Sequence, residues 1–250
     1  MIAYGSELAL KSPNAVRRTA LRYFGTYDLG ARVRFAAVRK AVRHLPEPSS
    51  VLDVGCGLGL LCFALTKMWP RASIVGTEID MERLRDAREL ARLHGLSNRV
   101  RFERVEDHDP AQRYDVVTCV DVLEHVDDDV AFAEQLFAST NAGGTLVLHV
   151  PAAVKRRFFR DFPEQHDHVR CGYDPAEVVR LLQTAGFVQT EVRFTFGALG
   201  AIGWEGFALA RQGSIIARGL LPLWYASAAA DSAYAPARGN GLLVTARRSA

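Results

Sequence analysis

The feature that most constrains this chain is a glycine loop that directly follows a short apolar run. Residues 51–59 read VLDVGCGLG, and Gly55, Gly57 and Gly59 let the backbone pass close to a ligand because they carry no Cβ atom. Apolar side chains at helical spacing follow the loop, which predicts a strand, a loop and a helix. The helix N-terminus would point at the ligand, and Asp53 would stand at the end of the strand.

The spacing of the glycines separates two classes of ligand. Loops that cradle a dinucleotide carry glycine at positions one, three and six, whereas here glycine occupies positions one, three and five, and Leu60 is sixth. Asp53 lies two residues before the first glycine and would repel a pyrophosphate. An acid at this place instead suits a ligand that carries an ammonium group or hydroxyls.

Helical and extended patterns alternate around this loop. A helix is expected at 31–45, ahead of two prolines. The expected strands are 50–54, 72–76, 99–105, 114–120 and 145–150, the last after a turn at Gly143-Gly144. The expected helices between them are 58–68, 81–93 and 128–139. This alternation predicts a parallel sheet with helices on both faces and a ligand at the carboxyl ends of its strands.

The last hundred residues have a different rhythm. A helix is expected near 174–185 and strands at 187–196 and 242–247, the last of them antiparallel, with an apolar helical segment at 197–230 between the two strands. The fold class is therefore α/β, a Rossmann-like, doubly wound, seven-stranded sheet. We expect a single domain whose parts are a helical extension (1–48), a ligand-binding core (50–150) and a substrate-side region (151–250) with a helical cap near 197–230.

Composition limits the compartment and the partners. The four cysteines form no C-x-x-C pair, and no signal sequence or long uncharged apolar run is evident, so we expect a soluble, cytoplasmic protein without a zinc site or disulfides. Residues 1–45 carry a net charge of +7 and the remainder −4. We interpret the basic residues as solvated helix faces, and we expect no nucleic acid partner because no basic stretch is interleaved with aromatic residues.

Further motifs follow the glycine loop in order. VGTEID places Glu78 after the second expected strand, VRFERVED places Glu106 and Asp107 after the third, and YDVVTCVDVLEHVDD and NAGGTLVLHVP come next. Together with VLDVGCGLG, these motifs resemble the class I S-adenosylmethionine-dependent methyltransferases. The D-V-L-E-H segment resembles the ubiquinone-type O-methyltransferases and other small-molecule members of that family.

The resemblance implies S-adenosyl-L-methionine as the cofactor. Glu78 would accept hydrogen bonds from both ribose hydroxyls, a task that suits a carboxylate. Glu106 or Asp107 would approach the adenine amino group, with a surface turn as the alternative. Arg34, or Arg32, would bind the cofactor's carboxylate, with solvated helix charge as the alternative. The expected cofactor-binding residues are Asp53, Gly55, Cys56, Gly57, Gly59, Glu78, Ile79, Glu106, Asp107, Val120 and Arg34.

Methyl transfer requires alignment of donor and acceptor and, for a hydroxyl acceptor, a base. His125, His149 and His168 are the candidate catalytic bases, although each could instead cap a backbone group or pair with an acid. The HDHVRCGY loop resembles a substrate-pocket segment of small-molecule methyltransferases. It implies that the residues that bind the substrate are His166, Arg170 and Tyr173, and we add Asp121 to them.

A divalent metal site is a further implication of the resemblance. Asp121, Glu124 and His125 match positions that resemble the metal ligands of ubiquinone O-methyltransferases, and oxygen ligands suit magnesium. The same D-V-L-E-H pattern is frequent in relatives that need no metal. We therefore do not expect a metal ion.

The apolar segment at 197–230 gives the best indication of the acceptor. It could be a lid on the core, a pocket wall for a lipid-like acceptor, or a contact with a membrane surface or a second subunit. We expect O-methylation of a small, apolar or lipid-like molecule. The alternatives are N- or C-methylation, an RNA methyltransferase, and a non-catalytic binding partner. Intact Asp53 and Glu78 argue against the last of these.

Overall fold

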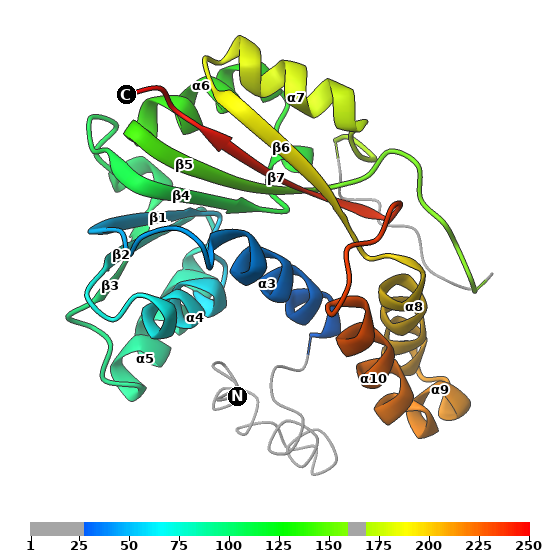
Figure 1. The fold of residues 1–250 in the computed structure, drawn as a ribbon. Helices are drawn as coiled ribbons and strands as arrows, with labels where there is room; N and C mark the ends of the chain where they lie inside the picture. The colour runs from blue at the N-terminus through cyan, green and yellow to red at the C-terminus, as the bar shows by residue number, and fades with distance from the viewer. Residues whose placement is uncertain (1–27, 160–168) are drawn as a thin grey trace.

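A sheet of seven strands forms the centre of the protein in the computed structural model, which describes residues 28–159 and 169–250 (Figure 1). The strand order is β3-β2-β1-β4-β5-β7-β6. The strands are β1 (Ser50–Val54), β2 (Ser73–Glu78), β3 (Val100–Arg104), β4 (Tyr114–Val120), β5 (Thr140–Pro151), β6 (Val188–Thr195) and β7 (Gly241–Arg247). This is the predicted doubly wound sheet.

The pairing of the strands places the ligand edge. β1 is parallel to both β2 and β4, β2 to β3, and β4 to β5, whereas β7 is antiparallel to both β5 and β6. The direction of winding reverses between β1 and β4, and ligands of such sheets bind where this reversal occurs, beyond the carboxyl ends of the strands. The glycine loop follows β1 at this point.

Helices cover both faces of the sheet. α6 (Asp129–Ser139) and α7 (Pro175–Thr184) lie on one face, and α3 (Leu29–Val42), α4 (Leu60–Met68) and α5 (Met81–Leu93) lie on the other (Figure 1). Two short 3-10 turns, η1 (Val105–Asp107) and η2 (Leu123–His125), follow β3 and β4. α7 begins with a capping box between Asp174 and Glu177 and has proline at its first turn, as its sequence predicts.

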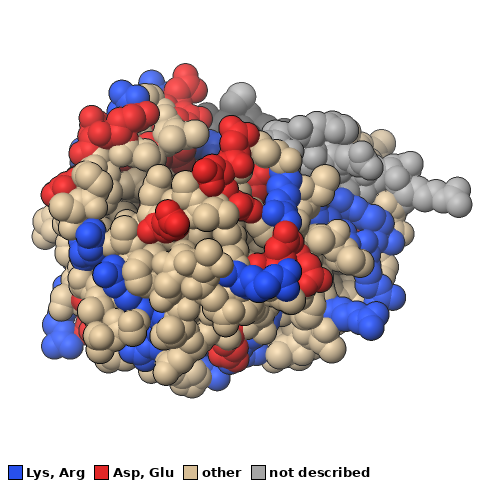
Figure 2. Space-filling view, turned by 90° about the horizontal axis from the view of Figure 1, so that it is seen from above, with Lys and Arg blue, Asp and Glu red and all other residues tan. Residues whose placement is uncertain are grey.

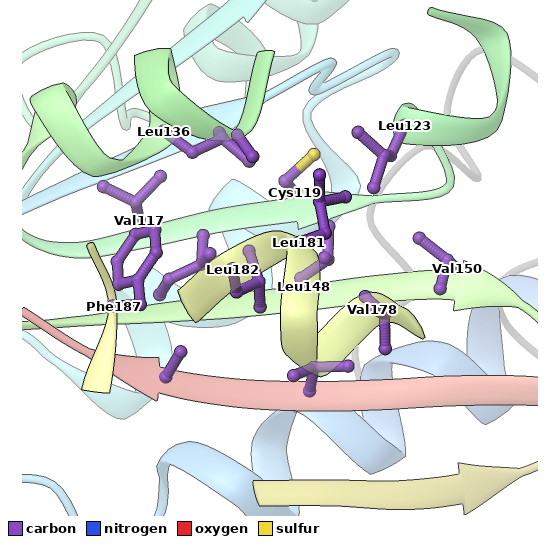
Figure 3. Packing of buried hydrophobic residues seen from close by; sticks show 14 of the residues in the cluster. Val117, Cys119, Leu123, Leu136, Leu148, Val150, Val178, Leu181, Leu182 and Phe187 are labelled. Atoms are coloured by element: carbon purple, nitrogen blue, oxygen red, sulfur yellow. The ribbon is translucent and has the colours of Figure 1, made fainter. Parts of the chain in front are cut away.

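Two apolar cores hold these layers together. On the α6 and α7 face, Val117 and Leu148 of the sheet pack with Leu136, Leu182 and Phe187 (Figure 3). On the other face, buried side chains of α3, α4 and α5 pack against β1, β2 and β3. The uninterrupted apolar strands of the sequence therefore correspond to strands buried on both faces.

The segment after β6 forms a helical cap of three helices, α8 (Ala198–Gln212), α9 (Ile215–Gly219) and α10 (Leu221–Asp231). Leu29 and Val33 of α3 pack there with Phe207 and Trp224. A Cβ atom at Gly206 would lie 2.5 Å from the indole of Trp224, so glycine permits the close approach of α8 and α10. Gly213, at φ +114°, ends α8.

One boundary differs from the sequence predictions. The turn predicted at Gly143-Gly144 is wrong, because β5 runs from Thr140 through both glycines with a register shift against β4. The helical segment expected at 197–230 is present and consists of three helices. Within the described ranges, no helix combines the length and the apolar character needed to span a membrane.

The surface over α6 and α7 mixes charges of both signs. Figure 2 shows this side, with acidic and basic side chains interspersed among uncharged residues. The expectation that no nucleic acid binds stays a prediction.

Candidate active site

The glycine loop has a backbone that only glycine adopts readily. Gly55, Gly57 and Gly59 have φ values of +70°, +55° and +72°. A Cβ atom would lie 2.3 Å from the Val122 side chain at Gly55 and 2.3 Å from the Phe102 ring at Gly59, whereas at Gly57 the nearest atom is a carboxylate oxygen 4.0 Å away. Two of the glycines are therefore required by packing, and the third leaves the loop open to a ligand.

Asp53 is a buried acid at the end of β1. Its side chain accepts hydrogen bonds from the Thr118 hydroxyl at 2.7 Å and the Cys62 thiol at 3.3 Å. Burial raises the pKa of Asp53 to about 6 against the opposing effect of these hydrogen bonds, and the nearby Glu78 carboxylate adds to the rise. The ion pairs formed among the described residues do not include Asp53. A cationic group on a ligand would therefore be stabilised here.

Glu78 lies at the end of β2, across the loop from Asp53. One carboxylate oxygen accepts from the Gly57 N–H at 2.8 Å, and the other accepts from the N–H groups of Ile79 at 2.9 Å and Asp80 at 3.1 Å. A carboxylate has about four lone-pair sites, so this fixed carboxylate retains capacity for a hydroxyl donor. The side chain of Ile79 beside it is 71% exposed and offers an apolar surface.

The remaining predicted cofactor residues lie along the same edge. Glu106 and Asp107 form η1 after β3, and both are exposed. Glu106 pairs with Arg104 at 3.1 Å. Val120 ends β4, and Cys56 donates its N–H to the Thr77 carbonyl at 2.9 Å. That Glu106 or Asp107 approaches an adenine amino group stays a prediction.

A buried network joins four elements beside this edge. His149 of β5 is 2% exposed, and its Nδ1 lies 2.5 Å from Asp121 Oδ1 while its Nε2 lies 2.8 Å from the Thr195 hydroxyl of β6. The other carboxylate oxygen of Asp121 pairs with Arg34 of α3. Asp121 adopts φ +53°, a left-handed conformation that turns the chain sharply after β4.

This network changes how His149 and Arg34 are interpreted. Both ring nitrogens of His149 are engaged, one by the Asp121 carboxylate and the other by the Thr195 hydroxyl, so the ring fixes the position of Asp121. The predicted role of His149 as a catalytic base stays a prediction. Arg34 is paired with Asp121, although its guanidinium has five donors and keeps capacity for a further carboxylate. Its predicted contact with the cofactor stays a prediction.

Glu124 lies in η2 and is 1% exposed, and neither of its carboxylate oxygens has a hydrogen-bond partner. Burial, with a further contribution from the Asp121 carboxylate, raises its pKa to about 8 against the smaller effects of its own backbone N–H, Arg34 and Lys155. His125, the next residue, is exposed. An uncompensated buried carboxyl of this kind is typical of functional sites.

The arrangement does not fit the divalent metal site that the family resemblance implied. Both oxygens of Asp121 are occupied, one of them by the cation of Arg34, which opposes a second cation. In the part of the chain that the structure describes, no three His, Cys, Asp or Glu side chains are grouped to hold a metal ion. We derive no step through a metal.

The predicted substrate loop is only partly described. His166 and His168 lie outside the described residues. Arg170 pairs with Asp129 at 3.1 Å and with Glu177, and its guanidinium lies 4.2 Å from the ring centre of Tyr173. Tyr173 is buried. These contacts fasten the loop to α6 and α7, and the predicted substrate contacts of Arg170 and Tyr173 stay predictions.

Sequence reasoning missed Thr118, Cys62 and Thr195. The pairing of β1 with β4 places Thr118 opposite Asp53, so a correct strand alignment could have found it. Cys62 lies one helical turn into α4, and only the packing of α4 brings it to Asp53. Thr195 reaches His149 from 46 residues away, and no local pattern signals that contact.

Three comparisons with known proteins agree with this geometry. A family model described as a methyltransferase domain matches residues 23–192. The ubiquinone biosynthesis O-methyltransferase of Vibrio vulnificus strain YJ016 is 39% identical over 149 residues, covering 53% of this chain and 60% of the relative. That of Xanthomonas axonopodis pv. citri is 30% identical over 168 residues, covering 61% and 68%.

The similarity is partial for other relatives. The matched region spans 47% of the ubiquinone biosynthesis O-methyltransferase of Bradyrhizobium sp. strain ORS 278, so this chain matches about half the length of that relative. Among solved structures, Haemonchus contortus phosphoethanolamine N-methyltransferase 2 has a TM-score of 0.62 at 17% identity, covering 92% of this chain and 56% of the other. The cyclase SpnF has a TM-score of 0.59 at 21% identity, covering 88% and 82%.

These solved structures establish the fold, and the family model covers most of the sheet together with the glycine loop, Asp53 and Glu78. The chain belongs to the methyltransferase-domain family, the class I, S-adenosylmethionine-dependent group that its motifs predicted.

Proposed function

We propose that this protein transfers the methyl group of S-adenosyl-L-methionine to an oxygen atom of a small, apolar acceptor. The observation that carries the proposal is the pair of buried carboxylates, Asp53 and Glu78, that flank the glycine loop at the carboxyl ends of β1 and β2. The names of the ubiquinone biosynthesis O-methyltransferases that resemble the chain support oxygen as the attacking atom and a lipid-like acceptor.

In this proposal, Glu78 accepts hydrogen bonds from the ribose hydroxyls of the cofactor, and Asp53 lies near its ammonium group. The open face at Gly57 leaves room for the ligand, and Ile79 covers one face of the adenine ring. The three N–H groups that hold the Glu78 carboxylate support this role, because they fix its orientation before the ligand arrives.

When bound, S-adenosyl-L-methionine supplies an electrophilic methyl group on a sulfonium. A hydroxyl acceptor that took this methyl group, with the sulfonium sulfur as the leaving group, would need a base on this chain to accept its proton. We assign the base to Glu124, since its carboxyl is unpaired and its pKa is raised to about 8, near the working pH of a general base. Asp121, oriented by His149, would hold the acceptor hydroxyl in line.

The helical cap supports an apolar acceptor. α8 and α10 pack on α3, the helix that presents Arg34 to Asp121, so the cap lies next to the network at the carboxyl edge.

We further propose a cytoplasmic location, which four free cysteines support. Ile215 and Ile216 at the tip of the cap are 83% and 79% exposed, which supports a contact with a membrane surface or a second subunit.

The acceptor class is tested with a donor carrying a labelled methyl group, incubated with the protein and a cell metabolite extract. We expect label in the lipid fraction, on oxygen, in base-stable ethers. Label that enters only RNA, or only amine nitrogen, would replace this acceptor class with one of the alternatives.

The base is tested through the pH profile of kcat/KM. Since the ionised form of Glu124 acts, kcat/KM should rise with pH and level off above about pH 8. Glu124→Gln should lower kcat/KM about 100-fold or more and abolish the rise. The exposed neighbour provides the matched control, because His125→Ala should keep the profile. If His125→Ala abolished the rise and Glu124→Gln kept it, the assignment would pass to His125.

A further inference from the structure

A groove on the far side of α3 from Asp121 is not used by the proposed reaction. α3, α4 and α10 enclose a cavity of about 380 Å³, which lies within the ~300–1,000 Å³ typical of small-molecule sites. Neither the glycine loop nor Asp53, Glu78 or the His149 network contributes to its lining.

The walls of the groove are mostly apolar. Leu61, Ala64 and Leu65 of α4 form one side of the groove, and Ala228 and Ala229 of α10 form the other. Small alanine side chains on both helices keep the groove open along its length. Such a space suits a single flexible hydrocarbon chain.

The charged side chains among the described residues that line the groove are cationic. They are Arg32, Arg39 and Lys67, and no Asp or Glu of the described residues lines it. Arg32 is half-buried, its guanidinium lies 4.8 Å from the ring centre of Tyr225, and its Nε is buried without a hydrogen-bond partner.

The buried Nε–H of Arg32 has lost its hydration without gaining a hydrogen-bond acceptor. Burial lowers the pKa of Arg32, which reflects this cost. None of the ion pairs among the described residues involves Arg32. A carboxylate from outside the chain would restore the balance, and guanidinium binds carboxylates with paired hydrogen bonds.

The charge of the rim also selects among occupants. Residues 1–27 hold four basic side chains and one acidic side chain, so that segment has the same sign of charge as the rim. An occupant with an anionic end and an apolar body is complementary to both parts of the groove.

We propose that this groove binds a single-chain amphiphile with a carboxylate head, such as a long-chain fatty acid taken up as the free molecule. The hydrocarbon chain lies between α4 and α10, and the carboxylate pairs with Arg32. The proposal is independent of methyl transfer, because the groove includes none of Asp53, Glu78, Asp121 and Glu124. Arg32, the sequence-based alternative to Arg34 at the cofactor's carboxylate, lines the groove, whereas Arg34 pairs with Asp121.

The test measures binding of cis-parinaric acid, a fluorescent fatty acid, to the full-length protein, with its methyl ester as the neutral probe. We expect the acid to bind about tenfold or more tightly than the ester, because a charge-assisted hydrogen bond contributes on that scale. Arg32→Met should weaken binding of the acid about tenfold and leave the ester within about twofold. Arg32→Lys should restore part of the loss.

Two further variants separate the groove from other sites. Ala64→Trp fills the groove and should weaken both probes, while Arg85→Met, on the exposed surface of α5, should change neither. Titration with S-adenosylhomocysteine checks that each variant is folded, and it tests the proposed function separately.

Several outcomes would overturn the proposal. Equal binding of acid and ester would remove the role of Arg32, and unchanged binding by Ala64→Trp would place the probe elsewhere. If the protein bound the probe only when the probe was presented in anionic vesicles, the binding site would be a membrane-contact surface and not a groove for the free molecule. A dimer that Ala64→Trp converts to monomers would show that a second copy fills the groove.

Discussion

The edge that holds the glycine loop, Asp53 and Glu78 (the cofactor half) and the region that holds Asp121, His149 and the helical cap (the acceptor half) are built differently. In the cofactor half, the ligand-facing groups themselves lie in short motifs: Asp53 and the three glycines stand within seven residues, and Glu78 ends the next strand. In the acceptor half, His149 meets Thr195 across 46 residues, and Glu205 of α8 accepts from the backbone of Phe158 across 47. The residues that face the cofactor are therefore marked by local motifs, whereas the network on the acceptor side has no local signature.

Two acids at the carboxyl edge, Asp121 and Asp53, also differ in how their charges are balanced. Asp121 is compensated on both oxygens by Arg34 and His149. Asp53 is compensated by a hydroxyl and a thiol only, and its charge awaits a ligand. Ligand binding should therefore matter more for the cofactor edge than for the network beside it.

The largest effect is expected from Gly59→Val in the cofactor half. The substitution forces a β-branched residue into φ +72° and places its Cβ 2.3 Å from the Phe102 ring, so we expect a loss of about 4 kcal/mol of unfolding free energy and of cofactor binding. Gly95→Ala is the matched control, since Gly95 has φ +65° with open space around it, and should cost only about 1 kcal/mol. Urea denaturation measures both, and similar losses for the two variants would mean that packing against Phe102 is unimportant.

His149→Phe should break the acceptor half. The change replaces the imidazole with an apolar ring and leaves Asp121 and the buried Thr195 hydroxyl without their partner. We expect the unfolding free energy to fall by about 3 kcal/mol. Thr195→Val removes only one of these contacts and should cost about 1 kcal/mol. If the proposed separation of the halves holds, neither variant changes the affinity for S-adenosylhomocysteine by more than about threefold. A strong loss of that affinity in both would show that the halves are coupled.

The pH dependence of stability should reveal the uncompensated charge of Asp53. Its folded pKa of about 6 lies above the ordinary aspartate value of 3.8, so the folded state binds more protons than the unfolded state between these values. Without cofactor, stability from this group should therefore fall as pH rises from about 4 to 6 and stay low above. Relative to wild type, Asp53→Asn should gain up to about 3 kcal/mol over this range. A difference between the two proteins that does not vary with pH would contradict the burial of a titrating acid.

The smallest effect is expected at the tip of the cap. Ile215→Ser with Ile216→Ser should change the unfolding free energy by less than about 0.5 kcal/mol, because both side chains are already in solvent. A loss above about 1 kcal/mol in thermal or urea unfolding would mean that the tip is buried in solution, for instance by a second subunit.

Much of the fold and of the cofactor edge could be predicted from the sequence. The apolar runs, the glycine loop and the acids after β1 and β2 are local signals, and the structure places Asp53 and Glu78 as those signals indicated. The glycine spacing also argued against a dinucleotide, which agrees with membership of a family that uses S-adenosylmethionine. The turn at Gly143-Gly144 was predicted wrongly because two adjacent glycines are typical of turns. In the structure they lie in β5 where its register against β4 shifts, and their backbone groups bond to Arg248.

The acceptor side could be predicted only in outline. The sequence indicated that His149 and Asp121 lie near the carboxyl edge, but not that they contact one another, since that contact depends on the register of β4 against β5. It likewise gave no sign that both nitrogens of His149 are engaged. The carboxylate oxygens of Glu124 have no hydrogen-bond partner because the side chain is buried, and the sequence of a short acidic turn does not indicate which of its acids is buried.

The most direct test of the central claim is calorimetric titration of the full-length protein with S-adenosylhomocysteine. We predict one binding site per chain. Glu78→Ala and Asp53→Ala should each weaken the affinity about tenfold or more, and Glu106→Ala should weaken it by less than about tenfold. Control titrations of Arg85→Met should match wild type. The absence of binding by the wild type, or equal binding by the Asp53 and Glu78 variants, would contradict the assignment of the glycine loop as the cofactor site.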